Sequence, residues 1–155
     1  MNGRSVRNAK IAQGLTALVL AALLLGLTLN ATGLVFPGPA IETRLVHLIT
    51  FVPMLFYLAG IWTIHRAFAA LAMGAEVNAI LAGLLTRIGA YLFLGGLARV
   101  FAEPWLIRLA LDRAWPWANF DVAAITLGAV GVMLILFTAP LREAAEMRNE
   151  LAEIL

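Results

Sequence analysis

The sequence predicts an all-α polytopic membrane protein with four transmembrane helices and a short amphipathic helix at the outer interface. Of its 155 residues, 63% are hydrophobic and 13% are charged, whereas a soluble domain carries about 25% charged residues. Residues 11–41 and 122–141 contain no charged side chain, and residues 45–64 contain one histidine, His47. Apolar runs of this length predict membrane spans, because about 20 helical residues cross a hydrocarbon core of about 30 Å.

The first span is predicted at residues 11–33, directly after the basic residues Arg4, Arg7 and Lys10. A basic start before an apolar run is also typical of a signal peptide. The apolar core of a cleaved signal has only about 7–15 residues and precedes a small-residue cleavage site. Residues 11–29 are longer and no clear cleavage motif follows, so we interpret the segment as a retained span.

The second span is predicted at residues 43–68. Pro53 lies inside it and should kink the helix, because proline removes one backbone hydrogen bond and clashes with the preceding turn. His65 and Arg66 mark the return to water. For residues 67–78 two interpretations stay open: they extend this helix, or they form a short helix on the membrane surface.

The third span is predicted at residues 79–102. We expect the helix to end at Glu103-Pro104, because proline disfavours helical backbone in the residue before it. Residues 105–115 then resemble a short amphipathic helix that lies at the outer interface, where indole rings are enriched. Three of the four tryptophans cluster in or beside this segment: Trp105, Trp115 and Trp117.

The fourth span is predicted at residues 119–140, with Asn119 or Asp121 as its N-cap. Residues 141–155 form a charged, amphipathic cytoplasmic tail. The chain is therefore expected to be one transmembrane domain, 1–155, without an internal repeat.

The distribution of Lys and Arg predicts the orientation. With the N-terminus inside, seven basic residues lie on the inner side: Arg4, Arg7, Lys10, Arg66, Arg87, Arg142 and Arg148. Three lie on the outer side: Arg44, Arg108 and Arg113. This asymmetry predicts a multi-pass protein of the bacterial cytoplasmic (inner) membrane with both termini in the cytoplasm.

Arg99 and Glu103 form a candidate intramembrane ion pair, because residues four apart are neighbours on one helix face. One interpretation is an ion or proton path, or a ligand anchor. The other, which we favour, is an ion pair at the outer interface that sets the depth of the helix. His47 and His65 are interpreted as structural, since 18 residues of helix separate them by about 27 Å and one metal ion cannot bind both.

The inner face carries a candidate surface for a partner. It comprises residues of the turn between the second and third spans and of the tail: Arg66, Glu76, Arg87, Arg142, Glu146 and Leu151. A tail that binds anionic lipid would be basic, and this one carries more acids than bases. We therefore expect the tail to be solvated or to pair with a protein.

Small residues recur at the spacings that let membrane helices approach closely. Gly89 and Gly96 are seven residues apart, and Ala124 precedes Gly128 by four. Such residues indicate helix packing within one chain or, alternatively, the face of a dimer.

Residues 66–89 and 141–150 resemble segments of the DUF2975 family of small bacterial membrane proteins. The resemblance rests on Gly74 and Glu76 in the turn, on the Arg87-Ile-Gly89 step, and on the charged segment that starts at Leu141-Arg142-Glu143. The chain departs from the family pattern where Ala75 and Val77 replace an acid and a phenylalanine. The resemblance implies four membrane helices and, through neighbouring regulator genes in many members, membrane sensing or sequestration of a cytosolic partner.

No catalytic constellation, metal-ligand spacing or phosphate-binding loop is present in the sequence, and it contains no cysteine. We therefore expect no enzyme activity, no metal and no cofactor. The sequence favours a non-enzymatic interaction or signalling and regulatory protein. The alternative is an accessory subunit packed on a larger membrane complex, and a small transporter or channel is favoured least. The expected partners are membrane lipids and a cytosolic or membrane protein or a second copy of the chain, not nucleic acid.

Overall fold

A computed structural model describes residues 3–35, 41–73, 77–112, 114 and 116–154, and the side chains of most of them. The helices are α1 (Gly3–Val35), α2 (Ile41–Ala72), α3 (Val77–Leu97), the π-helical η1 (Ala98–Ala102), α4 (Glu103–Leu111) and α5 (Val122–Ile154). Four helical segments are long and apolar enough to cross a membrane: Arg7–Leu29, Ile41–Ala72, Gly83–Leu111 and Val122–Ala144. The protein is thus an all-α multi-pass membrane protein, as the sequence predicts.

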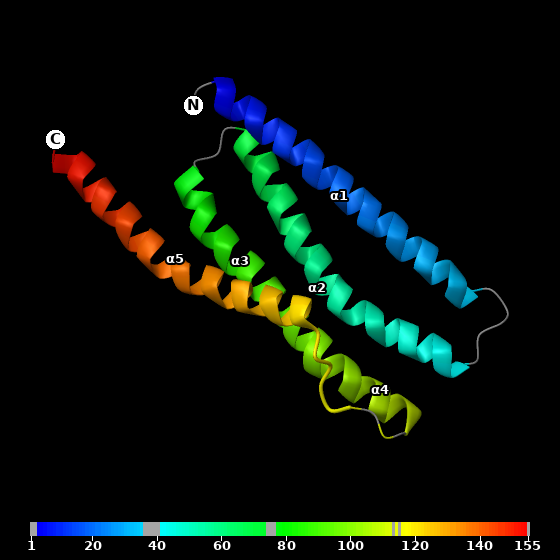
Figure 1. The fold of residues 1–155 in the computed structure, drawn as a ribbon. Helices are drawn as coiled ribbons and strands as arrows, with labels where there is room; N and C mark the ends of the chain where they lie inside the picture. Colours follow the sequence, from blue (N-terminus) through cyan, green and yellow to red (C-terminus); the bar gives the residue numbers. More distant parts are fainter. Residues whose placement is uncertain (1–2, 36–40, 74–76, 113, 115, 155) are drawn as a thin grey trace.

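One end of the molecule, here called the terminal end, holds the start of α1, the end of α2, the start of α3 and the end of α5 (Figure 1). The other end, here called the far end, holds the end of α1, the start of α2 and helix α4. An even number of spans requires this arrangement of the termini. Arg66 and Arg87 belong to the terminal half of the molecule, and Arg108 belongs to the far end.

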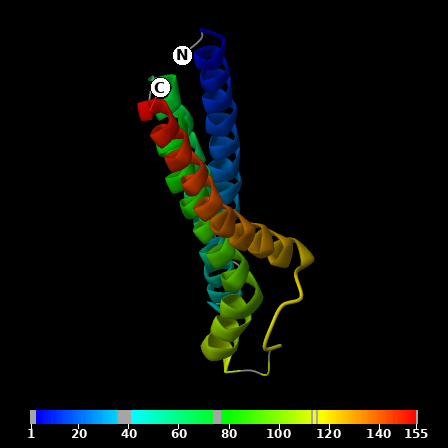
Figure 2. The same ribbon diagram turned by 90° about the vertical axis from the view of Figure 1, so that its left-hand side faces the viewer.

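The helices form an open row rather than a closed bundle. In the part of the chain that the structure describes, α1 contacts only α2, α2 contacts α3 and its continuation, and α5 contacts only α3 and η1. Figures 1 and 2 show α1 and α2 as an antiparallel pair beside α3, which α5 crosses on its other side. The outer helices α1 and α5 therefore present most of their surface to their surroundings, which the membrane can solvate because lipid tails are as apolar as leucine.

Glycines allow α3 and α5 to cross in close contact. A Cβ added to Gly131 would lie 2.5 Å from the backbone oxygen of Gly89, and one added to Gly96 would lie 2.7 Å from the oxygen of Ala124. The Thr86 hydroxyl donates a hydrogen bond of 3.2 Å to the hydroxyl of Thr138 across the same interface. The small residues that the sequence marked on these two helices therefore pack within one chain.

The structure settles part of the open question after the second span. Helix α2 continues to Ala72, so residues 67–72 extend it and do not form a separate surface helix. Residues 74–76, including Glu76, lie outside the described residues. Likewise α5 runs without interruption from the span into the tail as far as Ile154.

The predicted end of the third helix at Glu103-Pro104 is wrong. The backbone stays helical through Glu103 and continues as α4 to Leu111, where Asp112 adopts a left-handed conformation with φ 47°. The π-helical turn η1 comes just before the proline, and the N–H of Glu103 donates to the oxygen of Ala98, five residues back. This wider turn accommodates the proline ring, which would otherwise clash with the preceding turn. Of the segment predicted as a separate short helix, 105–115, residues 105–111 are helical, and they continue the third span, which runs from Gly83 to Leu111.

Candidate functional site

Pro104 leaves one backbone carbonyl without its helical donor. In an α-helix the carbonyl of Val100 would accept a hydrogen bond from residue 104, and proline has no N–H to give. The backbone N–H of Asn119 supplies the missing bond, at 2.8 Å. The connection between α4 and α5 is therefore tied back onto η1, and α5 starts beside the α3–α4 rod rather than at its tip (Figure 1).

This tie brings three charged side chains together, here called the ion cluster: Arg99, Glu103 and Asp121. Nη1 of Arg99 lies 2.5 Å from Oε2 of Glu103, which confirms the predicted pair. Nε of Arg99 donates to Oδ2 of Asp121 at 3.2 Å. The Glu103 residue is buried, with 8% of its surface exposed, so its charge depends on the arginine for compensation.

Asp121 is also the N-cap of α5, which begins at Val122; it is one of the two candidates, Asn119 or Asp121, that the sequence offers. Its Oδ1 accepts the N–H of Ala124 at 3.1 Å, and its backbone carbonyl accepts the N–H of Ile125 at 3.0 Å. The Ala124 hydrogen bond, together with the hydrogen bond from Arg99, lowers the pKa of Asp121 below its ordinary value. Asp121 is thus ionised at neutral pH, and its two oxygens serve the cap and the ion pair at once.

The geometry of the ion cluster supports a structural role. One cation, Arg99 of η1, pairs with two carboxylates, Glu103 of α4 and Asp121 directly before α5. The cluster therefore fastens the start of α5 to η1. Tyr57 on α2 lies within electrostatic range of Asp121 and Arg99. Its hydroxyl is buried and has no hydrogen-bond partner among the described residues.

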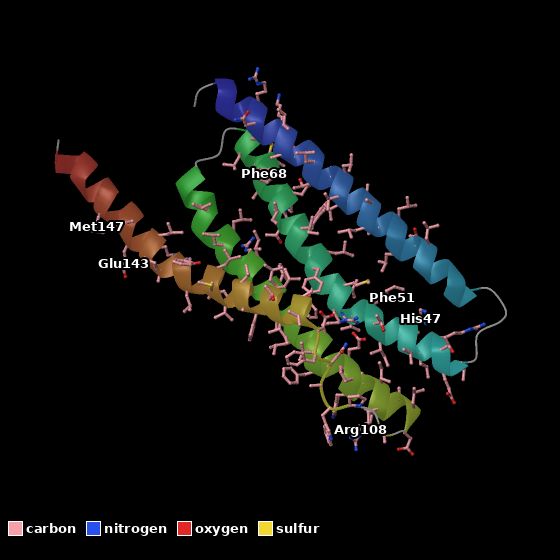
Figure 3. The ribbon with its side chains drawn as sticks, in the orientation of Figure 1. His47, Phe51, Phe68, Arg108, Glu143 and Met147 are labelled. Carbon is pink, nitrogen blue, oxygen red and sulfur yellow. The ribbon has the colours of Figure 1, made fainter. Side chains whose placement is uncertain are left out.

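The far end is held by a second contact between α4 and the connection. The guanidinium carbon of Arg108 lies 4.2 Å from the ring centroid of Trp117, in cation–π geometry. Figure 3 shows Arg108 on α4 at this end of the molecule. The contact joins two of the residues that the sequence marked as an aromatic, amphipathic segment.

The two histidines are placed in separate structural contacts. Nδ1 of His47 lies 2.8 Å from the carbonyl oxygen of Thr43 on its own helix. Nδ1 of His65 lies 3.2 Å from the hydroxyl of Thr16 and so links α1 to α2, and its ring stacks on Trp62 with centroids 5.7 Å apart. Among the described residues, no group of three His, Cys, Asp or Glu side chains could hold a metal ion.

The predicted inner-face residues fall in two places. Arg66 on α2 and Arg87 on α3 line one groove between these helices, of about 570 Å³. Arg142 lies exposed on α5, which has no described contact with α2. Glu76 and the side chains of Glu146 and Leu151 lie outside the described residues. The structure therefore brings two of the six residues together and places Arg142 on a separate helix.

Sequence reasoning missed the second role of Asp121. Its position before an apolar run indicates an N-cap, but nothing in its spacing points to Arg99, 22 residues earlier. The signal that could have found it is Pro104, because the orphaned carbonyl of Val100 requires a donor from another segment. The groove between α2 and α3 was also missed, since it depends on the angle between two helices.

Comparison with known proteins adds no relative to this description. A scan against protein-family models, a search of curated proteins and a search of solved structures each returned no match. The resemblance to the DUF2975 family stays a prediction.

Proposed function

We propose that this chain is a non-enzymatic protein of the bacterial cytoplasmic membrane that holds a regulatory or signalling partner protein on its cytoplasmic side through the extension of α5. The observation that carries the proposal is the length of this helix. The apolar span ends at Ala144, yet the same helix continues to Ile154. At a rise of 1.5 Å per residue, the extension reaches about 15 Å beyond the span.

In the extension beyond Ala144 the structure describes one side chain, that of Met147, and it is exposed. Glu143 and Met147 lie on α5 beyond its crossing with α3 (Figure 3). Met147 is an apolar side chain in a segment rich in charged residues, and 59% of its surface is exposed. On a continuous helix, positions 147, 151 and 154 share one face, and their apolar residues form the pattern that a helix presents to a groove in a partner.

Charge favours a protein over the membrane surface as the partner of this helix. Residues 141–155 contain two arginines and four glutamates. An anionic bilayer surface attracts basic segments and repels this one. An apolar stripe flanked by acids instead suits a groove with a basic rim on a cytosolic or membrane protein.

The test compares what copurifies with the full-length protein from its native membrane after mild crosslinking. Met147→Glu places a charge on the apolar stripe, and we expect at least a tenfold loss of the captured partner. Glu143→Gln, which alters an exposed residue of the same helix, serves as the matched control and should retain the partner. Equal recovery with both variants, or no protein captured by the unaltered chain, would refute the proposal.

The open row supports a second candidate, an accessory subunit packed laterally on a larger membrane complex. Only 6% of the α1 span and 17% of the α5 span are buried in the chain itself, so both outer helices offer long lateral faces. Gentle detergent extraction followed by native electrophoresis tests this candidate. Comigration with a larger complex is expected, and migration as a free monomer at all detergent concentrations would exclude it.

A further inference from the structure

The groove between α2 and α3 is open because the two helices separate toward the terminal end. Nearer the far end they touch: a Cβ on Gly95 would lie 2.6 Å from the Tyr57 ring, and Gly60 faces Tyr91. Half of the lining residues are small, and an added Cβ on Gly83 would meet no atom within 4 Å. The small residues are Ala59, Thr63, Ala67, Ala70 and Gly83. Small side chains on diverging helices therefore leave the volume of about 570 Å³ unfilled.

The charges of this groove have one sign. Arg66 and Arg87 line it from opposite helices, and no carboxylate is among its lining residues in the part of the chain that the structure describes. Neither arginine has an ion pair with any residue that the structure describes. Both belong to the end of the molecule where the basic residues concentrate, which is the end that the positive-inside rule assigns to the cytoplasm.

The remaining lining residues suit an amphiphile. Trp62 and Tyr91 are the aromatic residues of the groove, and Ala59 lies beside them on the side of the membrane interior. From residue 59 to residue 70 the groove follows α2 for roughly 16 Å. It thus offers two guanidinium groups beside a mixed lining in which Ala59, Trp62 and Leu84 supply apolar surface along the helices.

We propose that this groove binds an anionic phospholipid of the cytoplasmic leaflet, with the phosphate held between Arg66 and Arg87. Guanidinium groups bind phosphate oxygens in a fixed, often bidentate geometry. Basic pockets between transmembrane helices at the cytoplasmic side suit such head groups. The acyl chain lies along Ala59 and Tyr91, where a soluble phosphate compound would gain nothing. This site is separate from the α5 extension and does not depend on its function.

Trp62 provides a direct probe, because it lines the groove, whereas Trp105 on α4 and Trp117 beside Arg108 lie at the far end. The full-length chain with Trp105, Trp115 and Trp117 replaced by phenylalanine is placed in vesicles of phosphatidylcholine. Phosphatidylglycerol with brominated acyl chains is then added, and quenching of Trp62 fluorescence is compared with quenching by brominated phosphatidylcholine. Two cations near the surface predict a preference of roughly tenfold or more for the anionic lipid.

Four variants decide the source of the preference. Arg66→Gln together with Arg87→Gln should reduce it to near unity, and Arg142→Gln, which removes a charge at the same end outside the groove, should leave it unchanged. Gly83→Leu places a large side chain in the groove while both arginines are retained, and it should also abolish the preference. Arg66→Lys with Arg87→Lys keeps the charges and guards against a folding defect, and part of the preference should remain.

Three outcomes would overturn the proposal. Equal quenching by both brominated lipids in the unaltered groove would show that it does not select anionic lipid. Competition by millimolar inorganic phosphate or glycerol phosphate that removes the quenching would assign the site to a soluble phosphate instead. Loss of the preference in Arg142→Gln to the same degree would show a diffuse surface effect rather than a site.

Discussion

Helix α3 packs closely against α5 but leaves a groove beside α2. On the α5 side its glycines lie against backbone: added Cβ atoms on Gly89 and Gly96 would lie 2.5 and 2.7 Å from backbone oxygens. On the α2 side, toward the terminal end, Gly83 faces open space and the helices enclose a groove. Glycine therefore allows close contact at the α3–α5 interface and leaves space at the α2–α3 interface. The difference is that the backbone of α5 lies against Gly89 and Gly96, whereas no atom lies close to Gly83.

The charges follow the same division. Arg99, close to the start of α5, is held by the carboxylates of Glu103 and Asp121. Arg66 and Arg87 in the groove have no described carboxylate beside them. A closed interface with matched charges stabilises the chain, whereas an open one with unmatched charges is available to a ligand. The comparison thus separates the structural half of the molecule from the half that we assign to binding.

The largest effect on stability is expected from adding a side-chain atom where the glycines of α3 and α5 meet. Gly131→Ala would place its Cβ 2.5 Å from the Gly89 oxygen and 2.7 Å from the Phe93 nitrogen, both backbone atoms that cannot move aside. The helices must separate, and we expect a loss of about 3 kcal/mol in the free energy of unfolding. Unfolding in detergent, followed by circular dichroism across a denaturant titration, measures it.

Gly83→Ala is the matched control, because it makes the same chemical change on the open side of α3. Alanine is favoured over glycine in a helix by about 1 kcal/mol, so this variant should be neutral or stabilised. Equal behaviour of the two variants would contradict the distinction between a closed and an open face.

The next effect tests the ion cluster. Arg99→Ala leaves the buried carboxylate of Glu103 without its cation, and breaking a buried pair in this way costs about 3–5 kcal/mol when both partners are fully buried. Arg99 is about one-third exposed, so we expect about 2 kcal/mol. The double variant Arg99→Ala with Glu103→Gln removes the stranded charge and should recover part of the stability. No recovery would mean that packing of the arginine stem, not charge, is what matters.

Much of the fold could be predicted from the sequence, because long apolar runs define spans regardless of tertiary detail. The four spans follow from these runs. The pairing of Arg99 with Glu103 follows from their i,i+4 spacing on one helix, and the capping by Asp121 follows from its position directly before an apolar run. The prediction that the helix ends at Glu103-Pro104 was wrong because it considered only the local effect of proline on the helix. Contacts with another segment compensate for that effect. The π-turn absorbs the ring, and Asn119 satisfies the orphaned carbonyl of Val100.

The groove could not be predicted, because it depends on how two helices diverge. Sequence reasoning placed Arg66 and Arg87 on one inner face, but it could not say that they line a common cavity. Nor could it distinguish the glycines that meet backbone from Gly83, which meets nothing. Spacing indicates which residues share a face of one helix, whereas the distance to the next helix is a property of the whole fold.

The smallest effect concerns Asp121, whose two roles can be separated. Asp121→Ala removes both the cap and the ion pair, and loss of an N-cap should lower the unfolding midpoint by about 2–4 °C. Asparagine is as good an N-cap as aspartate, so Asp121→Asn should lose only the charge contribution to Arg99. A midpoint for Asp121→Asn equal to that of Asp121→Ala would mean that the cap contributes nothing.

The pH dependence of the same residue gives a sharper version of this test. Because the folded-state pKa of Asp121 is lowered, the unfolded chain binds its proton more readily than the folded one. The contribution of this charge is fully present above the unfolded pKa of about 4 and is lost as the pH falls through the folded value. The difference in stability between the unaltered chain and Asp121→Asn should therefore stay constant from about pH 8 to pH 5 and shrink only below about pH 4. A difference that changes between pH 5 and pH 8 would assign the effect to another group and remove Asp121 from the ion cluster.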